Sequence, residues 1–171
     1  GAPYAIGGAV AMDAYGVRRY TSDVDIFALD ENRFPVIRAL RSVGLHIVPV
    51  MEPFHYAAYM LEHNDPDVRI DILFPAGEPE LSAVEYPEPA MFGGVKVKVF
   101  TINMLVATKF YSDRQKDEGD ILMMLNAGIF DPAEVTALIA SFDPDGAKYF
   151  EALIQKLSKP RVTRKRPTRK T

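Results

Sequence analysis

Short runs of apolar residues along the first hundred positions predict strands that alternate with helices. We expect strands at 3–7, 24–29, 46–50, 55–62, 68–74 and 95–100, and helices at 8–15 and 32–43. Each of these helices is followed by a glycine, Gly16 or Gly44, the residue that most readily closes a helix. The polar cluster at 64–67 favours a turn, so the runs on either side are predicted to pair as an antiparallel hairpin. The Pro- and Glu-rich segment 77–90 is expected to be a loop.

After residue 100 the spacing of apolar residues becomes that of helices. The predicted helices cover 102–112, 116–127, 132–141 and 146–157. Asp131 and Pro132 suit the N-cap and the first turn of the third one. The chain is therefore predicted to be an α+β (mixed α/β) protein. We expect a mixed sheet with flanking helices over 1–100, a small helical subdomain packed on it over 101–158, and a disordered tail over 159–171.

The composition is that of an ordinary folded domain, with 171 residues of which 48% are apolar and 25% charged. The sequence contains no cysteine, which excludes a disulfide scaffold, a thiolate zinc site and a cysteine nucleophile. No segment approaches the roughly 18 apolar residues of a membrane span, and no signal segment opens the chain. We therefore expect a cytoplasmic protein without membrane contact. Gly1 is not an initiator methionine, so the sequence is expected to be a processed chain or a fragment.

Charge is distributed unevenly along the chain. The net charge is −3, but residues 159–171 contain seven Lys or Arg and no acidic residue. The remaining residues carry 13 basic against 23 acidic side chains. A basic tail on an acidic body indicates contact with a polyanion such as RNA. The alternative is a solvated tail without a partner.

Three aspartates are the strongest candidates for chemistry. Asp23 and Asp25 lie two positions apart in a strand, so both carboxylates point to one face while Val24 and Ile26 face the core. Carboxylates this close repel each other unless a cation lies between them, and a hard divalent ion such as Mg²⁺ is the natural partner. Asp71 interrupts another apolar strand, where it needs a metal or a hydrogen-bond donor. A salt bridge to a nearby arginine is the alternative for Asp71.

A pair of glycines precedes these aspartates. Gly7 and Gly8 lie at a predicted junction of strand and helix, where missing side chains let a phosphate approach the backbone amides. The sequence resembles the DNA polymerase beta-type nucleotidyltransferase superfamily in the order of its motifs. These are an apolar residue before Gly-Gly, a short helix, Arg-Tyr-Thr-Ser-Asp-Val-Asp over 19–25, and a lone aspartate in a later strand. Within this superfamily the pattern is most similar to the AbiEii-like branch, the toxins of toxin–antitoxin systems. The resemblance covers about residues 4–127, although the chain lacks the helix that precedes Gly-Gly in that branch.

The resemblance implies a nucleotidyltransferase fold, a bound nucleoside triphosphate and two Mg²⁺ ions. It implies catalytic and metal-binding roles for Asp23, Asp25 and Asp71. It also implies that an antitoxin protein is a partner and that tRNA is the nucleotide acceptor. The expected nucleotide-binding residues are Gly7, Gly8, Arg19, Thr21, Lys109 and Asp120. For Arg19 and Thr21 the alternative is that they only satisfy loop backbone and surface charge.

Lys109 lies on the apolar face of its predicted helix, seven residues after Ile102. Either it reaches triphosphate oxygens or its aliphatic stem passes the edge of the core. In the next helix Asp117 falls within the apolar arc and Asp120 at its edge. Asp117 is therefore the better candidate for an ion pair with Lys109 or Arg114.

The resulting hypothesis is the transfer of a nucleoside monophosphate from an NTP to a hydroxyl acceptor, with release of pyrophosphate. Asp71 would also take the proton, and Lys109 would neutralise charge on the departing pyrophosphate. The alternatives are transfer to a small molecule such as an aminoglycoside, and a non-catalytic nucleotide- or RNA-binding module on the same fold. The three histidines, at 46, 55 and 63, share no ligand spacing and are expected to be structural or surface residues.

Overall fold

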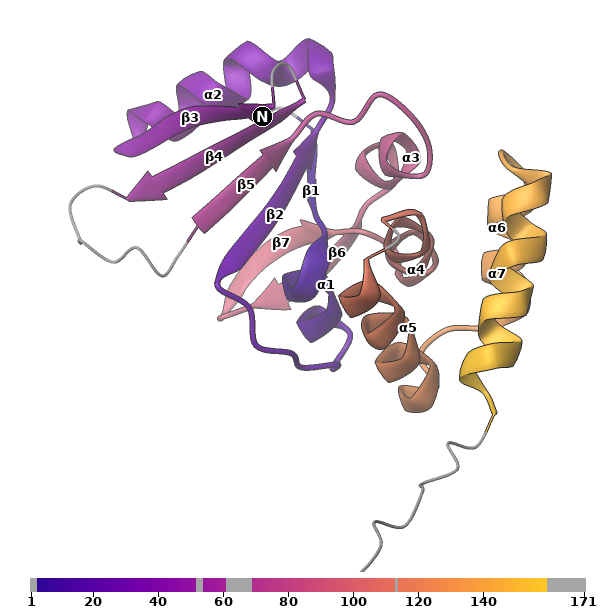
Figure 1. The fold of residues 1–171 in the computed structure, drawn as a ribbon. Helices are drawn as coiled ribbons and strands as arrows, with labels where there is room; N and C mark the ends of the chain where they lie inside the picture. The colour runs from indigo at the N-terminus through magenta and orange to yellow at the C-terminus, as the bar shows by residue number, and fades with distance from the viewer. Residues whose placement is uncertain (1–2, 52–53, 61–68, 113, 160–171) are drawn as a thin grey trace, which may run out of the picture.

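The computed structural model describes residues 3–51, 54–60, 69–112 and 114–159 (Figure 1). Its centre is a seven-stranded sheet in the order β3-β4-β5-β2-β1-β7-β6. The strands are β1 (Tyr4–Ile6), β2 (Asp23–Ala28), β3 (Leu45–Met51), β4 (His55–Met60), β5 (Arg69–Leu73), β6 (Glu88–Phe92) and β7 (Val95–Val99). Two neighbouring pairs, β2 with β5 and β1 with β7, are parallel, and the other pairs are antiparallel. The sheet is therefore mixed, as predicted.

The helices flank this sheet and extend beyond it (Figure 1). They are α1 (Gly8–Ala14), α2 (Arg33–Ser42), α3 (Glu80–Glu85), α4 (Ile102–Tyr111), α5 (Gln115–Ala127), α6 (Pro132–Ala140) and α7 (Pro144–Leu157), with a 3-10 turn at Asp30–Asn32 before α2. Three of the later helices begin at side-chain caps, because Thr101, Asp131 and Asp143 accept hydrogen bonds from backbone N–H groups of the first turn. The local sequence therefore determines where these three helices start.

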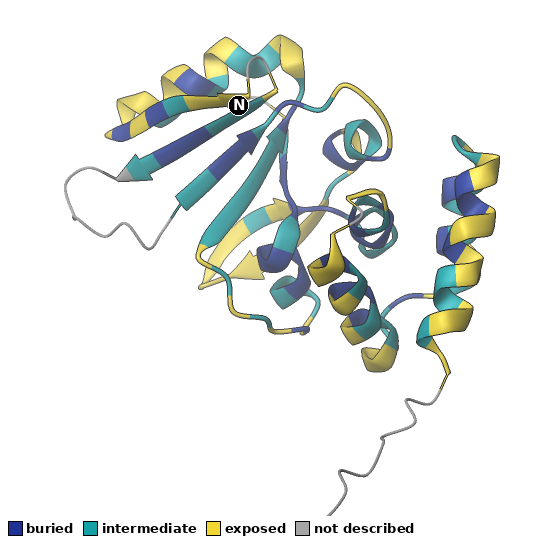
Figure 2. Cartoon of the chain, in the orientation of Figure 1, coloured by how far each residue is buried: buried dark blue, intermediate teal, exposed yellow. Residues whose placement is uncertain are grey.

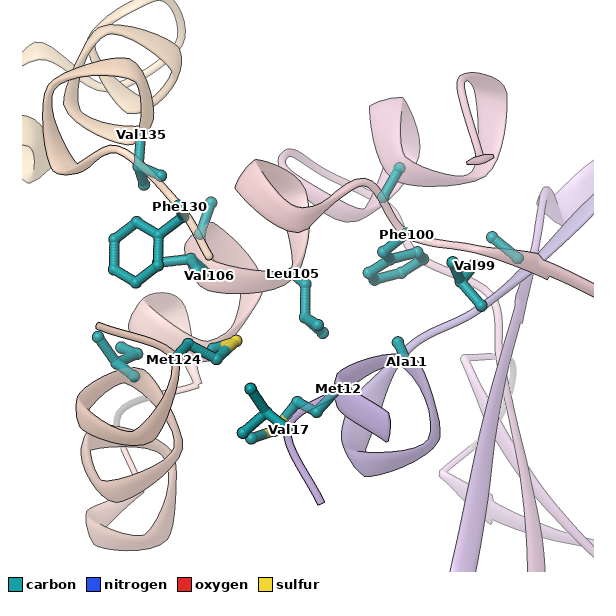
Figure 3. Packing of buried hydrophobic residues seen from close by; sticks show 14 of the residues in the cluster. Ala11, Met12, Val17, Val99, Phe100, Leu105, Val106, Met124, Phe130 and Val135 are labelled. Carbon is teal, nitrogen blue, oxygen red and sulfur yellow. The ribbon is translucent and has the colours of Figure 1, made fainter. Parts of the chain in front are cut away.

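Two hydrophobic clusters hold the elements together, and Figure 2 shows the buried positions along the strands and helices. The larger cluster runs from β1 and α1 through α4 and α5 to α6 and α7. Figure 3 shows its middle part, where Met12 and Val17 approach Leu105 and Met124. The smaller cluster packs Ile37 of α2 against the sheet. The helices after residue 100 and the β1–α1 half of the sheet therefore share one core.

The segment 77–90 departs from its prediction. It contains α3 and the start of the edge strand β6, so the prediction of a loop there was wrong. Ala83 and Val84 of α3 are fully buried in the larger cluster. This burial stabilises a helix that the Pro- and Glu-rich composition of the segment does not predict. The hairpin prediction is confirmed, since β4 and β5 pair antiparallel, while its turn at 64–67 lies outside the described residues. So does the tail beyond Lys159.

Within the described ranges, none of the helices has the length and apolar character needed to cross a membrane.

Candidate active site

The site is built on two parallel neighbouring strands, β2 and β5. Asp23 and Asp25 point to one face of β2, and Asp71 of β5 is the direct register partner of Asp25. One ligand atom from each of these three carboxylates lies within 4.8 Å of the other two. The predicted clustering of the three aspartates is therefore present, and strand alternation together with parallel register produces it.

The three carboxylates differ in their electrostatics. Burial raises the pKa of Asp25, and the negative charges of Asp23 and Asp71 raise it further. The pKa of Asp23 is lowered, chiefly by a hydrogen bond from the Thr21 hydroxyl. Three convergent oxygen ligands with mutual repulsion fit a hard divalent cation, which would remove that repulsion. The residues present thus suit the Mg²⁺ site expected from the sequence.

Asp71 has protein partners of its own. Its Oδ1 accepts hydrogen bonds from Arg69 Nε at 2.9 Å and from an Arg69 terminal nitrogen at 2.5 Å. His55 Nε2 lies 2.6 Å from the same oxygen. The salt bridge to arginine considered for Asp71 therefore exists beside the candidate metal site. The β4–β5 pairing brings His55 to the site, a position that the sequence did not indicate, and its hydrogen bond to Asp71 is compatible with the structural role expected. His46 is exposed, as expected, and His63 lies outside the described residues.

Close packing explains the two glycines. A Cβ on Gly8 would lie 1.8 Å from Asp25 Oδ2, and Gly8 has a φ of +59°, which strains any other residue. A Cβ on Gly7 would lie 2.8 Å from the ring of Phe27. The Gly7 N–H also donates to the backbone oxygen of Asp25 at 3.0 Å. The glycines therefore allow β2 to place its carboxylate directly against the start of α1.

A buried charge network lies next to the carboxylates. Lys109 of α4 is 6% exposed, and its Nζ donates to Asp117 Oδ1 at 2.8 Å and to Asp120 Oδ2 at 2.6 Å. The inward orientation of Lys109 was predicted, and so was an ion pair of Asp117 with Lys109 or Arg114; both of these ion pairs form. Asp120 also pairs with Arg19, whose Nε lies 3.0 Å from Asp120 Oδ1. The network therefore ties the loop before β2 to α4 and α5.

Asp117 has two further partners in this network. Ser112 Oγ lies 2.5 Å and Arg114 Nε 2.6 Å from Asp117 Oδ2. Burial raises the pKa of Asp117, but the hydrogen bonds from Lys109, Ser112 and Arg114 outweigh burial and lower the pKa below its ordinary value. Asp117 is therefore an ionised, fully buried carboxylate that joins the end of α4 to the first turn of α5.

A cleft of about 320 Å³ contains the aspartates and the residues around them. Of the predicted nucleotide-binding residues, Gly8, Arg19 and Lys109 line it; Gly7, Thr21 and Asp120 contact lining residues instead. The sequence analysis did not assign six polar lining residues to the site, namely His55, Glu80, Thr108, Ser112, Arg114 and Lys116. Lys116 was the easiest to find, because it stands between Arg114 and Asp117 at the start of α5. Its charge lowers the pKa of both Asp23 and Asp25.

No protein-family model and no curated protein sequence matches the chain. Solved structures do share its fold. The antibiotic-resistance factor ANT(2'')-Ia aligns with a TM-score of 0.55 and 18% identity, over 91% of this chain and 83% of that chain. The lincosamide antibiotic adenylyltransferase LnuA, with lincomycin bound, gives 0.51 and 16%, over 71% and 84%. A Thermotoga maritima protein described as a nucleotidyltransferase gives 0.50 and 13%, over 74% and 83%. This similarity confirms the predicted nucleotidyltransferase fold; it does not single out the AbiEii-like branch.

Proposed function

We propose that this protein is a metal-dependent nucleotidyltransferase that transfers a nucleoside monophosphate from an NTP to a hydroxyl acceptor. The observation that carries the proposal is the cluster of Asp23, Asp25 and Asp71, whose ligand atoms lie within 4.8 Å of one another in the wall of the cleft. The shared fold supports it, because two of the structural neighbours are an adenylyltransferase and a protein described as a nucleotidyltransferase.

Asp23, Asp25 and Asp71 would hold Mg²⁺, with two ions expected from the resemblance. Bound Mg²⁺ would polarise the phosphoryl oxygens and lower the pKa of the acceptor hydroxyl. Thr21 fixes the carboxylate of Asp23 through its hydroxyl. Arg69 fixes that of Asp71. The protein therefore presents oriented carboxylates to the ions, because donors that hydrogen-bond to metal ligands keep those ligands in position.

In the reaction the acceptor oxygen attacks the α-phosphorus of the NTP, and the bond from that phosphorus to the bridging oxygen of the β-phosphate breaks. Pyrophosphate leaves with the electrons of that bond. Lys116 and Arg114 line the cleft and would offset charge on the departing pyrophosphate. Asp71 would take the acceptor's proton at Oδ2, because its Oδ1 is held by Arg69 and His55.

The proposed nucleotide-binding residues divide into two groups in this geometry. Gly8 lines the cleft beside Asp25 and would let phosphates approach the start of α1, while the Gly7 N–H donates to the backbone oxygen of Asp25 and so holds β2 in place. Arg19 and Lys109 both pair with Asp120, and the three residues would act by holding the cleft walls in place. Lys109 would then hold the buried ion-pair network together, while the more exposed Lys116 would bind the triphosphate oxygens.

The acceptor has two candidates. The basic residues of 159–171 favour RNA, and an AbiEii-like toxin that modifies tRNA and binds an antitoxin remains the prediction from the motif. The fold neighbours favour a small hydroxylated molecule, since LnuA acts on a lincosamide antibiotic and ANT(2'')-Ia is an antibiotic-resistance factor. An aminoglycoside-like acceptor therefore stands beside the RNA acceptor.

A comparison of the full chain with a chain that ends at residue 158 separates the two acceptors. Each protein is incubated with Mg²⁺ and an NTP labelled on its α-phosphate, in the presence of cellular RNA or of a low-molecular-weight extract. If RNA is the acceptor, deletion of 159–171 lowers its labelling steeply and more so at higher salt. If the acceptor is small, labelling of the extract is unchanged by the deletion. Labelling of neither fraction by either protein would contradict the proposed transfer.

A further inference from the structure

An apolar pocket of about 380 Å³ adjoins the cleft. Cleft and pocket share the lining residues Phe27, His55, Leu73 and Glu80, so the two spaces are continuous. The remaining lining residues are Met51, Phe54, Phe74, Pro75 and Ala76. The pocket thus has aromatic and aliphatic walls, with the Glu80 carboxylate and the His55 imidazole on the side shared with the cleft, and the proposed transfer assigns it no role.

The position of this pocket follows from the strand register. On the site face of β2, Asp23, Asp25 and Phe27 succeed one another at alternate positions, with Leu73 of β5 paired to Phe27. At one end of this row, Asp23 follows the loop that carries Arg19. The cleft is lined by four cationic residues that do not line the pocket, namely Arg19, Lys109, Arg114 and Lys116. The apolar pocket begins at Phe27 at the other end, roughly 13 Å away by strand rise. Asp25 and Asp71 therefore lie between the cationic end of the cleft and the apolar pocket.

The order of these residues indicates where the leaving pyrophosphate and the attacking acceptor would lie. In an in-line displacement the attacking and leaving oxygens lie on opposite sides of the phosphorus. Pyrophosphate belongs at the end with Lys116 and Arg114, so the acceptor approaches from the end with Phe27 and Leu73. We infer that the pocket beside Glu80 is the acceptor subsite, and that it takes a compact acceptor with an apolar body and a cationic amine. The inference rests on the proposed function and names its substrate class.

Glu80 provides the charge complementarity. Its side chain is half-buried at the first turn of α3, and no salt bridge is formed by it with any described residue. Burial raises the pKa of the Glu80 carboxyl, which a cationic ligand would reverse. Among the described lining residues of the pocket there is no lysine or arginine. A polyanion such as RNA would find no counter-charge in this pocket, whereas an amine would.

Two probes of nearly equal shape test the pocket without a known substrate. The probes are 2-phenylethylamine, which is cationic at neutral pH, and 2-phenylethanol, which is neutral. Binding to the full chain is followed by NMR shift perturbation at saturating Mg²⁺. We expect the amine to bind about tenfold more tightly than the alcohol, since one charge-assisted hydrogen bond supplies such a factor.

Variants locate the effect. Glu80→Gln keeps the shape of the side chain and removes its charge. The ratio of amine affinity to alcohol affinity should therefore fall to about one, the value expected without a charge-assisted contact. Glu85→Gln, on the same helix but exposed and outside the pocket, should keep the preference. Phe54→Ala should weaken both probes equally, because it removes apolar contact only. Equal binding of amine and alcohol to the wild type, or a preference that survives Glu80→Gln, would overturn the inference.

A competition experiment distinguishes the acceptor from the nucleobase of the NTP. The amine should remain bound when a saturating NTP with Mg²⁺ is added, because the two occupy different ends of the site. Displacement of the amine by a nucleoside would assign the pocket to the base and overturn the inference, while leaving the proposed transfer intact. The proposed function is tested separately by measuring the Tm of the protein with an NTP, in the presence and absence of Mg²⁺. The Tm should rise only when Mg²⁺ is present.

Discussion

Asp25 on β2 and Asp71 on β5 are direct partners in a parallel strand pair, which fixes two carboxylates side by side on one face of the sheet. Their repulsion, added to burial, raises the pKa of Asp25. The backbone register therefore enforces the proximity, and side-chain rearrangement alone cannot relieve it. Sites of this kind store a destabilisation that a bound cation removes.

Replacement of Asp25 by Asn should therefore stabilise the protein without divalent metal while removing its response to Mg²⁺. We expect the Tm to rise by a few degrees, since about 1 kcal/mol corresponds to roughly 2–4 °C in a domain of this size. Differential scanning calorimetry with EDTA and with Mg²⁺ measures both effects. A lower Tm in EDTA, or an Mg²⁺ shift equal to that of the wild type, would contradict the assignment.

Gly8→Ala should disturb the site more than the fold. The added Cβ would lie 1.8 Å from Asp25 Oδ2, and the φ of +59° adds a cost of about 1–3 kcal/mol. Mg²⁺ affinity, followed by calorimetry, should fall because the Asp25 carboxylate must move. Gly119→Ala is the matched control. A Cβ added at Gly119, on an exposed turn of α5, would meet no atom within 4 Å. The substitution should therefore stabilise the protein by about 0.4–1 kcal/mol and leave its Mg²⁺ affinity unchanged.

Lys109→Met should be strongly destabilising. It leaves the buried carboxylates of Asp117 and Asp120 without their shared cation, and breaking a buried pair costs about 3–5 kcal/mol. Lys156→Met, which removes an exposed partner of Glu118, should cost less than about 1 kcal/mol. Urea denaturation measures both. A Lys109→Met protein of normal stability that has lost NTP affinity would instead make Lys109 a direct phosphate ligand.

Acid should weaken the α4–α5 junction through Asp117. Burial raises the pKa of this carboxyl, but its hydrogen bonds lower it more, so the folded pKa lies below the unfolded one. The stabilisation by ionised Asp117 is then fully present above about pH 4 and is lost as the pH falls through the folded pKa. The difference in unfolding free energy between wild type and Asp117→Asn should accordingly narrow below about pH 4 in urea titrations. A difference that stays constant with pH would show that Asp117 is not the titrating group.

The sequence predicts those parts of the site that depend on local periodicity. The spacing of Asp23 and Asp25 determines their common face, and the helical position of Lys109 determines that it turns inward. The pairing of Asp117 with Lys109 follows from the same helical geometry. In each case a period of two or of 3.6 residues is enough to place the side chain.

Contacts made by distant pairing are the parts that the sequence does not disclose. His55 reaches Asp71 only because β4 pairs with β5 in one particular register. Glu80 enters the cleft because α3 packs on the larger core, although its segment has the composition of a loop. Burial in tertiary structure overrides local propensity in that segment.

The most direct test is transfer of label from NTPs carrying a labelled α-phosphate, with Mg²⁺, to cellular RNA and to a low-molecular-weight extract, by the wild type and by Asp25→Asn. Each of the four NTPs is used in turn, and circular dichroism verifies that both proteins are folded. We expect label on one fraction with the wild type and a loss of about 10³-fold with Asp25→Asn, the scale expected when an essential electrostatic contribution is removed. Equal labelling by the two folded proteins would contradict the proposed transfer.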